Sequence, residues 1–131
     1  MSEESRTIDP QTAYVALAAD GHAQVYPGGD EFWSQPEGRL ERIGEHWLVS
    51  EYSFDADWPT WEMHPEADEF VYLLEGEADM LLELAAGPRI VRLSDRGAVV
   101  VPRNIWHTAK IRRACRMLHV TMGKGTQTRP A

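Results

Sequence analysis

The stretch that decides the fold is WEMHPEADEFVYLLEGEADMLLEL, residues 61–84. Its Val, Tyr, Phe and Leu residues follow one another without a helical period, which is typical of strands. Within it, Glu62, His64 and Glu69 are side chains able to bind a metal ion, placed where a strand normally buries apolar groups. Residues two apart in a strand share a face, so Glu62 and His64 are predicted to point the same way.

Short runs rich in Val, Ile, Leu and aromatic residues fill the middle of the chain. The predicted strands are 46–54, 69–75, 78–84, 89–94, 98–102, 105–111 and 115–122. Turn signals separate them, among them Gly76, Gly87-Pro88 and the SDRG sequence at 94–97. So many closely spaced strands predict an all-β sandwich or barrel. Residues 12–26 fit either strand or helix, and 28–35 predict one short helix capped by Asp30.

Length and composition favour one globular domain over residues 1–131, with 43% hydrophobic and 26% charged residues. The ends, 1–10 and 123–131, are expected to be loose. The chain has no apolar run near the ~20 residues that span a bilayer, and its polar start does not resemble a signal peptide. A single cysteine, Cys115, excludes an internal disulfide and favours a reducing cytoplasm. This thiol is expected to be a small buried hydrophobe rather than a nucleophile.

The net charge of −8 argues against a nucleic-acid partner, because binding to phosphates requires a surplus of Lys and Arg. The charges are unevenly distributed: residues 1–86 hold nearly all the acids, and residues 87–131 hold most of the bases. Apolar residues remain interleaved with those late bases, so a basic tail is not indicated. We therefore expect the late strands to lie beside the early ones, with opposite charges meeting across the sheet.

A second histidine, His107, follows in the predicted strand 105–111, between Trp106 and Thr108. Taken singly, a Glu in a strand is usually solvated and a lone His is usually a core residue. The joint spacing resembles the cupin superfamily, whose first motif is commonly written G-x5-H-x-H-x3–4-E-x6-G. Glu62, His64, Glu69 and Gly76 follow that spacing.

The second cupin motif is commonly written G-x5-P-x-G-x2-H-x3-N, and the order Gly97, Pro102, Asn104, His107 is similar to it. The departures are specific. Glu62 stands at the first histidine position, Gly97 is one residue closer to Pro102, and Ile111 replaces the final Asn. Asn104 stands at a turn glycine, and Asn tolerates left-handed backbone better than most residues.

The resemblance covers about residues 46–122 and implies a cupin-type double-stranded β-helix, a jelly-roll barrel with at most one or two short helices. It also implies four metal ligands, Glu62, His64, Glu69 and His107. Imidazole and carboxylate together suit one divalent ion: Zn²⁺, Fe²⁺, Mn²⁺, Ni²⁺ or Co²⁺. If Glu62 turns away, the other three form a two-His-one-carboxylate set. Asp68 is either a residue that orients a ligand or a solvated turn residue.

Strand alternation predicts which side chains line the barrel beside these ligands. The expected pocket is mostly apolar, with Val71, Leu73, Ile105 and Ala109 pointing inward. The candidates for its rim are Tyr52, Trp61 and Trp106. His119 either faces the same cavity or is a buried structural residue. His22 and His46 are expected at the surface.

The resemblance implies a small-molecule metalloenzyme of the dioxygenase, isomerase or lyase type. The alternative is a non-catalytic cupin that binds a small molecule or a metal. A metal-free barrel would leave Glu62 and Glu69 facing inward without a counter-charge, which is costly. The first motif has no cluster of Lys or Arg nearby, which counts against a phosphorylated sugar. The strand 69–75 is apolar on both faces, since Phe70, Tyr72 and Leu74 lie opposite Glu69. That face is covered either by residues of the same chain, such as 11–26, or by a second copy in a homodimer.

Overall fold

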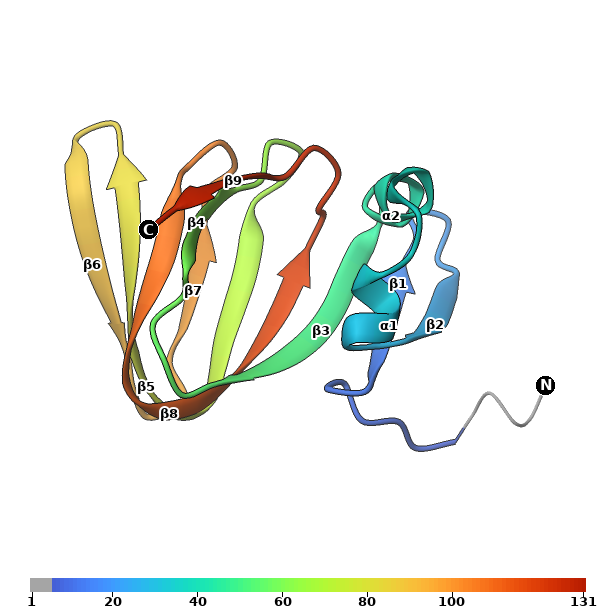
Figure 1. The fold of residues 1–131 in the computed structure, drawn as a ribbon, viewed down its shortest axis with the longest axis horizontal. Helices are drawn as coiled ribbons and strands as arrows, with labels where there is room; N and C mark the ends of the chain where they lie inside the picture. Colours follow the sequence, from blue (N-terminus) through green and yellow to red (C-terminus); the bar gives the residue numbers. More distant parts are fainter. Residues whose placement is uncertain (1–5) are drawn as a thin grey trace.

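The computed structural model describes residues 6–131, and its architecture confirms the all-β prediction (Figure 1). The strands are β1 Ala13–Leu17, β2 Ala23–Pro27, β3 Trp47–Phe54, β4 Thr60–Met63, β5 Glu69–Leu84, β6 Gly87–Leu93, β7 Ala98–Val101, β8 His107–Thr121 and β9 Gln127–Pro130. The two short helices are α1 Asp30–Trp33 and α2 Glu37–Ile43. Neither of these helices has the length or the apolar character needed to cross a bilayer.

Two long strands, β5 and β8, organise the barrel. They pair with each other along most of their length, and their two halves take part in opposite walls. One wall runs β2-β1-β3-β8-β5-β7 and uses the end of β8 and the start of β5. The other wall adds β6 to the end of β5, and adds β4 and β9 beside the start of β8. The sheet is thus folded over on itself, as Figure 1 shows.

The continuity of these strands corrects the predicted breaks. Gly76, expected in a turn, lies inside β5, where the pairing with β8 shifts register between Leu73 and Ala78. Its φ is +88°, and a Cβ placed there would lie 2.2 Å from the Ala114 carbonyl oxygen and 2.5 Å from Cys115 Cα. A glycine is therefore required both by the backbone conformation and by the close approach of β8. At Gly76 the chain therefore bends within β5, where the sequence predicted a turn between two strands.

The interior is divided into two packed regions. The larger fills the barrel between the two walls and includes Leu73, Met80, Leu82 and Met117, all nearly inaccessible to solvent. The smaller lies where α1 and α2 pack on β1 and β3, around Tyr14, Phe32 and Ile43. Cys115 is buried in the larger region, as predicted, and burial raises the pKa of its thiol.

The predicted pairing of early acids with late bases is confirmed. Arg116 on β8 contacts Glu51 on β3 at 2.7 Å and Glu75 on β5 at 2.8 Å. Further pairs join Asp79 to Arg92 and Arg112, Glu83 to Arg129, Asp57 to Lys110 and Glu45 to Lys124. The charge asymmetry along the chain thus becomes local neutralisation on the outside of the sheet.

Three local predictions are corrected. The ambiguous segment 12–26 forms β1 and β2, and Asp30 is the first residue of α1 rather than its cap, since Gly29 occupies that position. Residues 127–130, expected to be loose, form β9 and pair with β4. There the Arg129 guanidinium lies 5.2 Å from the Trp61 ring and 4.4 Å from the Trp106 ring, which anchors the strand. Within the N-terminal segment 1–10, residues 1–5 lie outside the described range.

Substitution of Gly76 by Ala tests the role of the bend. We expect a loss of about 3 kcal/mol or more in the free energy of unfolding, because the methyl group meets backbone atoms that cannot move aside. Gly21→Ala is the matched control, since Gly21 also has positive φ (+93°) but open space around a Cβ. Its expected loss is about 1 kcal/mol. Urea denaturation measures both, and equal losses would contradict the assigned backbone clash.

Candidate metal centre

Four polar side chains converge at one end of the barrel interior. Glu62 lies on β4, His64 just after it, Glu69 at the start of β5 and His107 at the start of β8. Glu69 Oε1 lies 3.4 Å from His64 Nε2 and 3.2 Å from His107 Nε2. Glu62 Oε1 lies 3.7 Å from His64 Nε2, and one ligand atom each of Glu62, His64 and His107 lies within 4.8 Å of the others. The structure therefore brings together the four residues that the cupin spacing singled out.

Hydrogen bonds set the orientation and tautomer of both histidines. His107 Nδ1 lies 3.0 Å from the Ile105 carbonyl oxygen, which can only accept, so Nδ1 carries the proton. His64 Nδ1 lies 2.8 Å from Thr126 Oγ1, and that hydroxyl donates to the Gly123 carbonyl oxygen at 2.7 Å. Since the Thr126 hydroxyl has used its proton, it accepts from His64 Nδ1–H. In both neutral imidazoles the Nε2 lone pair is left facing the centre.

The Glu69 carboxylate is held from its other side. Its Oε2 accepts a hydrogen bond from Thr121 Oγ1 at 2.5 Å and one from His119 Nδ1 at 3.1 Å. Its Oε1 has no hydrogen-bond partner within residues 6–131, and the same holds for Nε2 of His64 and His107. Three buried, electron-rich atoms thus face one another.

This donor set fits a divalent cation. Buried polar atoms are normally paired, and three unpaired acceptors pointing at one another would repel unless a cation lies between them. Two imidazole nitrogens with one or two carboxylate oxygens are ligands that Zn²⁺, Fe²⁺, Mn²⁺, Ni²⁺ and Co²⁺ accept. Hydrogen bonds from the far nitrogen of a metal-bound histidine, such as those to Ile105 and Thr126, are a regular feature of such sites.

The pKa shifts of Glu69 and His107 indicate that the buried carboxylate attracts positive charge. Burial alone would raise the pKa of Glu69, yet its contacts with His107, His119 and His64 hold it well below 4.5. Burial lowers the pKa of His107, but the contact with Glu69 outweighs it and leaves that pKa raised above 6.5. The buried carboxylate therefore stays ionised and attracts a cation, either a proton on His107 or a metal ion.

Two backbone contacts join the loops that carry the ligands. Asn104 N–H donates to the His64 carbonyl oxygen at 2.9 Å, and Asn104 has the predicted left-handed backbone, with φ of +64°. Asp68 Oδ1 accepts from Arg103 N–H at 2.9 Å. Asp68 is exposed, and its recorded contacts join these loops rather than orienting a ligand. His22 is exposed and His46 is half-buried in a turn before β3.

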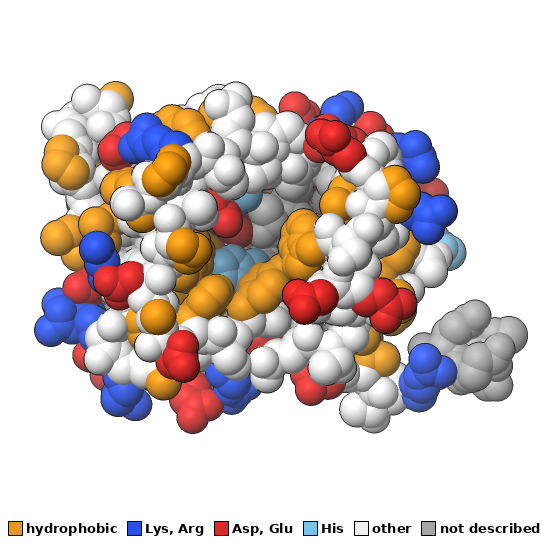
Figure 2. Space-filling view, viewed as in Figure 1, with side chains coloured by type: hydrophobic (Ala, Val, Ile, Leu, Met, Phe, Trp, Pro, Cys, Tyr) orange, Lys and Arg blue, Asp and Glu red, His pale blue; other side chains and the backbone are white. Residues whose placement is uncertain are grey.

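A cavity of about 580 Å³ opens beside Glu62, His64 and Glu69 and reaches the α1–α2 side of the molecule. Figure 2 shows it as a hollow with apolar walls and with acidic and histidine side chains at its floor. Its wall includes residues of β3, the loop before β4 and both helices: Phe32, Trp33, Leu40, Ile43, Leu48, Tyr52, Phe54 and Trp58. Glu62, His64, Glu69 and His119 also border it.

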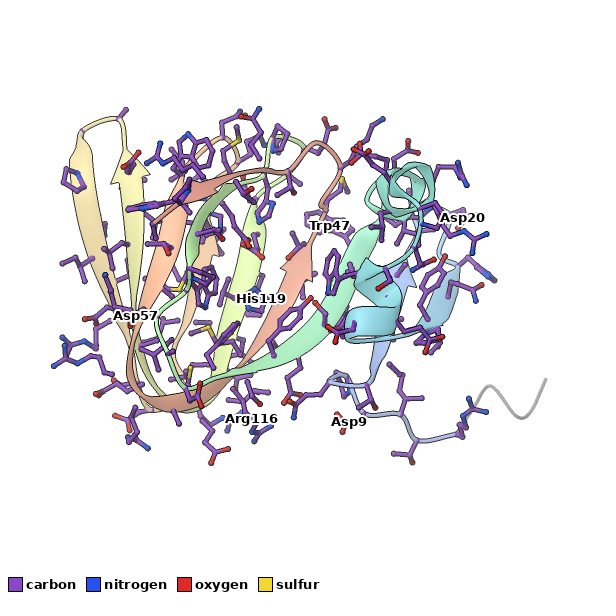
Figure 3. The ribbon with its side chains drawn as sticks, viewed as in Figure 1. Asp9, Asp20, Trp47, Asp57, Arg116 and His119 are labelled. Carbon is purple, nitrogen blue, oxygen red and sulfur yellow. The ribbon has the colours of Figure 1, made fainter. Side chains whose placement is uncertain are left out.

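The predicted pocket residues separate into groups. Tyr52 and His119 line the cavity, and Figure 3 shows His119 inside the barrel. Burial raises the pKa of the Tyr52 phenol, so its hydroxyl stays neutral. The predicted inward residues Val71, Leu73 and Ala109 are instead part of the packed barrel core, with Ile105 packed against it. Trp61 and Trp106 flank Arg129 at the β9 wall.

The reason for this difference is that alternation identifies the inward face of a strand but not whether the space in front of it is filled. The cavity residues of α1 and α2 were not predicted, although Leu40 and Ile43 are apolar residues three apart, the spacing of one helix face. Trp58 also went unpredicted, because it lies in a loop.

Searches against protein-family models and against curated proteins found no match. Solved structures do match. A cupin superfamily protein from Desulfitobacterium hafniense gives a TM-score of 0.50 at 21% identity, covering 59% of this chain and 67% of that one. Peruvianin-I, a cysteine peptidase from Thevetia peruviana latex, gives 0.53 at 14% identity, covering 64% and 56%.

Hydroxypropylphosphonic acid epoxidase from S. wedmorenis gives a TM-score of 0.48 at 17% identity, and the match covers 57% of this chain but only 43% of the epoxidase. Taken with the strand order described above, the likeness shows that this chain has a cupin-type fold.

Proposed function

We propose that this protein binds one divalent metal ion through His64, Glu69 and His107, with Glu62 as a fourth ligand, and uses it on a small molecule held in the cavity. The observation that carries the proposal is the set of three buried, unpartnered atoms, His64 Nε2, His107 Nε2 and Glu69 Oε1, directed at one point. While both rings are neutral and donate from Nδ1, none of the three atoms carries a proton to share, whereas one metal ion would contact all three.

The geometry favours chemistry over a purely structural metal. Structural sites are closed by four protein ligands, whereas catalytic sites keep a position for water or substrate. Here three donors are buried, Glu62 is 36% exposed, and the cavity begins at the same point. An ion that accepts five or six ligands would keep positions free beside these four residues, and there it could polarise an oxygen of the ligand or bind O₂. This supports an oxygenase, isomerase or lyase rather than a metal store.

Metal content tests the site directly. Protein reconstituted with Co²⁺ and then desalted is expected to retain about one ion per chain, because three or four ligands hold it. The His64→Ala/His107→Ala double variant is expected to retain almost none. His22→Ala, an exposed histidine outside the site, is the matched control and should behave as wild type. Equal metal in wild type and the double variant, measured by elemental analysis, would refute the proposal.

The hydrogen bond from His64 to Thr126 provides a finer test. Thr126→Val removes the acceptor that fixes the imidazole, and we expect Co²⁺ affinity to fall about 10- to 100-fold. Thr128→Val is the control, because Thr128 also borders the cavity but, within residues 6–131, its side chain forms no hydrogen bond to a histidine. Competition with a chromophoric chelator gives both affinities. If the two variants bind Co²⁺ equally well, Thr126 does not orient His64.

We also propose a homodimer formed through the outer face of the β2-β1-β3-β8-β5-β7 wall. Residues paired across neighbouring strands form one apolar row on that face: Val25, Val15, Val49, Val120, Phe70 and Val100. The helices cover the opposite face through Tyr14, Ala16 and Leu48, so residues 11–26 extend this row rather than cover it. Phe70 and Val100 remain 40% and 57% exposed, and a two-fold contact with a second copy is the common way to bury such a face.

Light scattering at micromolar concentration is expected to give a mass of about 30 kDa, twice the 14.9 kDa of the chain. Phe70→Glu places a charge in the row and should yield a monomer. Ile90→Glu is the control, because Ile90 is 66% exposed on β6, away from the row, and its replacement should leave the dimer intact. A wild-type mass of one chain would refute the dimer.

A further inference from the structure

The cavity above the candidate metal centre has an unusual balance of side chains. Among its lining residues in the described chain, none is Lys or Arg, and the acidic ones are Glu37, Glu41, Glu62 and Glu69. Glu62 and Glu69 belong to the metal site, where two carboxylates balance a divalent ion. Glu37 and Glu41 lie on α2 at the cavity wall and have no such counter-charge among the lining residues. The cavity is therefore acidic even with the metal site filled.

The basic residues around this region either do not line the cavity, as with Arg39 and Arg42 of α2, or are held in ion pairs. Lys124 contacts Glu45 at 3.2 Å, and Arg129 contacts Glu83 at 2.7 Å while it lies between Trp61 and Trp106. An anionic ligand would therefore enter a low-dielectric space with no cation of the protein to pair with, and past two carboxylates. Carboxylate and phosphate binding sites normally contain Arg or Lys for this reason.

Much of the cavity wall is aromatic. Phe32, Trp33, Tyr52, Phe54 and Trp58 all line it. The faces of aromatic rings attract cations through their negative quadrupole, and protein sites for organic ammonium ions combine such rings with carboxylates. The shared chemistry of this wall and of Glu37 and Glu41 thus favours a positive ligand.

A second, independent observation points to a ligand in the same place. His119 Nε2 and Trp58 Nε1 are buried and have no hydrogen-bond partner within residues 6–131, and both residues line the cavity. Their rings are 5.9 Å apart. His119 donates Nδ1–H to Glu69, so its Nε2 is an acceptor, whereas the Trp58 indole is only a donor. An ammonium group can donate to His119 Nε2, and an oxygen of the same ligand can accept from Trp58 Nε1–H, whereas a carboxylate could serve only Trp58.

We propose that the ligand of this cavity is a small organic cation, a protonated amine with an apolar or aromatic body and an oxygen donor that reaches the metal. This substrate class rests on the proposed metal site. The proposal excludes carboxylates and phosphates as ligands. It assigns the selection for positive charge to Glu37 and Glu41.

Three benzohydroxamates of similar size test the charge selection on the Co²⁺-loaded protein. All share the metal-binding hydroxamate and differ only in the para group, which is aminomethyl, ethyl or carboxylate. Titration followed by the visible spectrum of Co²⁺ gives each Kd. We expect the aminomethyl probe to bind most tightly, with the carboxylate probe on the order of tenfold weaker or more, and the gap to narrow at high salt.

The Glu37→Gln/Glu41→Gln double variant locates the effect. The ratio of the Kd values for the carboxylate and aminomethyl probes should fall to within about threefold of unity, since the double variant lacks the two negative charges that discriminate between the probes. Glu45→Gln is the control, because Glu45 lies just past α2 but pairs with Lys124 and does not line the cavity. Its ratio should equal that of wild type. A carboxylate probe that binds wild type as tightly as the aminomethyl or ethyl probe overturns the proposal.

A second pair of probes without a metal-binding group separates this proposal from the metal site. Benzylamine and benzoate are titrated against the tryptophan fluorescence of metal-free protein, where Trp58 and Trp33 report on the cavity. Benzylamine binding tighter than benzoate supports charge selection even if Co²⁺ fails to bind. Benzoate binding equally well, or neither probe quenching the fluorescence at millimolar concentration, overturns it even if the metal site is present.

Discussion

The buried carboxylate of Glu69 is the group on which the rest of the structure depends. An ionised carboxylate inside a protein is unfavourable by several kcal/mol unless hydrogen bonds and positive charge surround it. Here the partners come from both ends of β8: His107 lies at the start of that strand, while His119 and Thr121 lie near its end. A strand that passes through both walls supplies all three of these partners. The site therefore depends on the bend at Gly76, where β5 and β8 fold over.

The same folding-over divides the barrel into a filled part and an open part. Beyond Gly76, Met80 and Leu82 share one packed core with Leu73 and Met117 of the opposite wall. On the other side, β3 leans toward the two helices (Figure 1). The cavity lies there, and its lining includes Tyr52, Trp58 and residues of α2. Opposite charges neutralise one another along the outer surface, as in the contacts of Arg116.

The sequence predicted the strand content and the four converging ligands because both depend on local spacing. Glu62, His64 and Glu69 lie within eight residues, and Asn104 sets the turn before His107 through its own backbone preference. The sequence did not predict the full lining of the cavity, because contacts that spacing does not encode form it. Trp58 comes from a loop, and α2 contributes through packing against β3. β9 was missed because its residues, QTRP, are mostly exposed and lack apolar alternation, and its pairing relies on Arg129 between two tryptophans.

The contact between His64 and Thr126 has a consequence for the order in which the site forms during synthesis. The two residues are 62 positions apart, and Thr126 follows every ligand in the sequence. A nascent chain whose residue 107 has just left the ribosome already carries all four proposed ligands, yet lacks the hydroxyl that fixes the tautomer of His64 and the strand that pairs with β4. Non-local contacts of this kind form late in folding. On the proposed metal site, tight binding would therefore require the completed barrel.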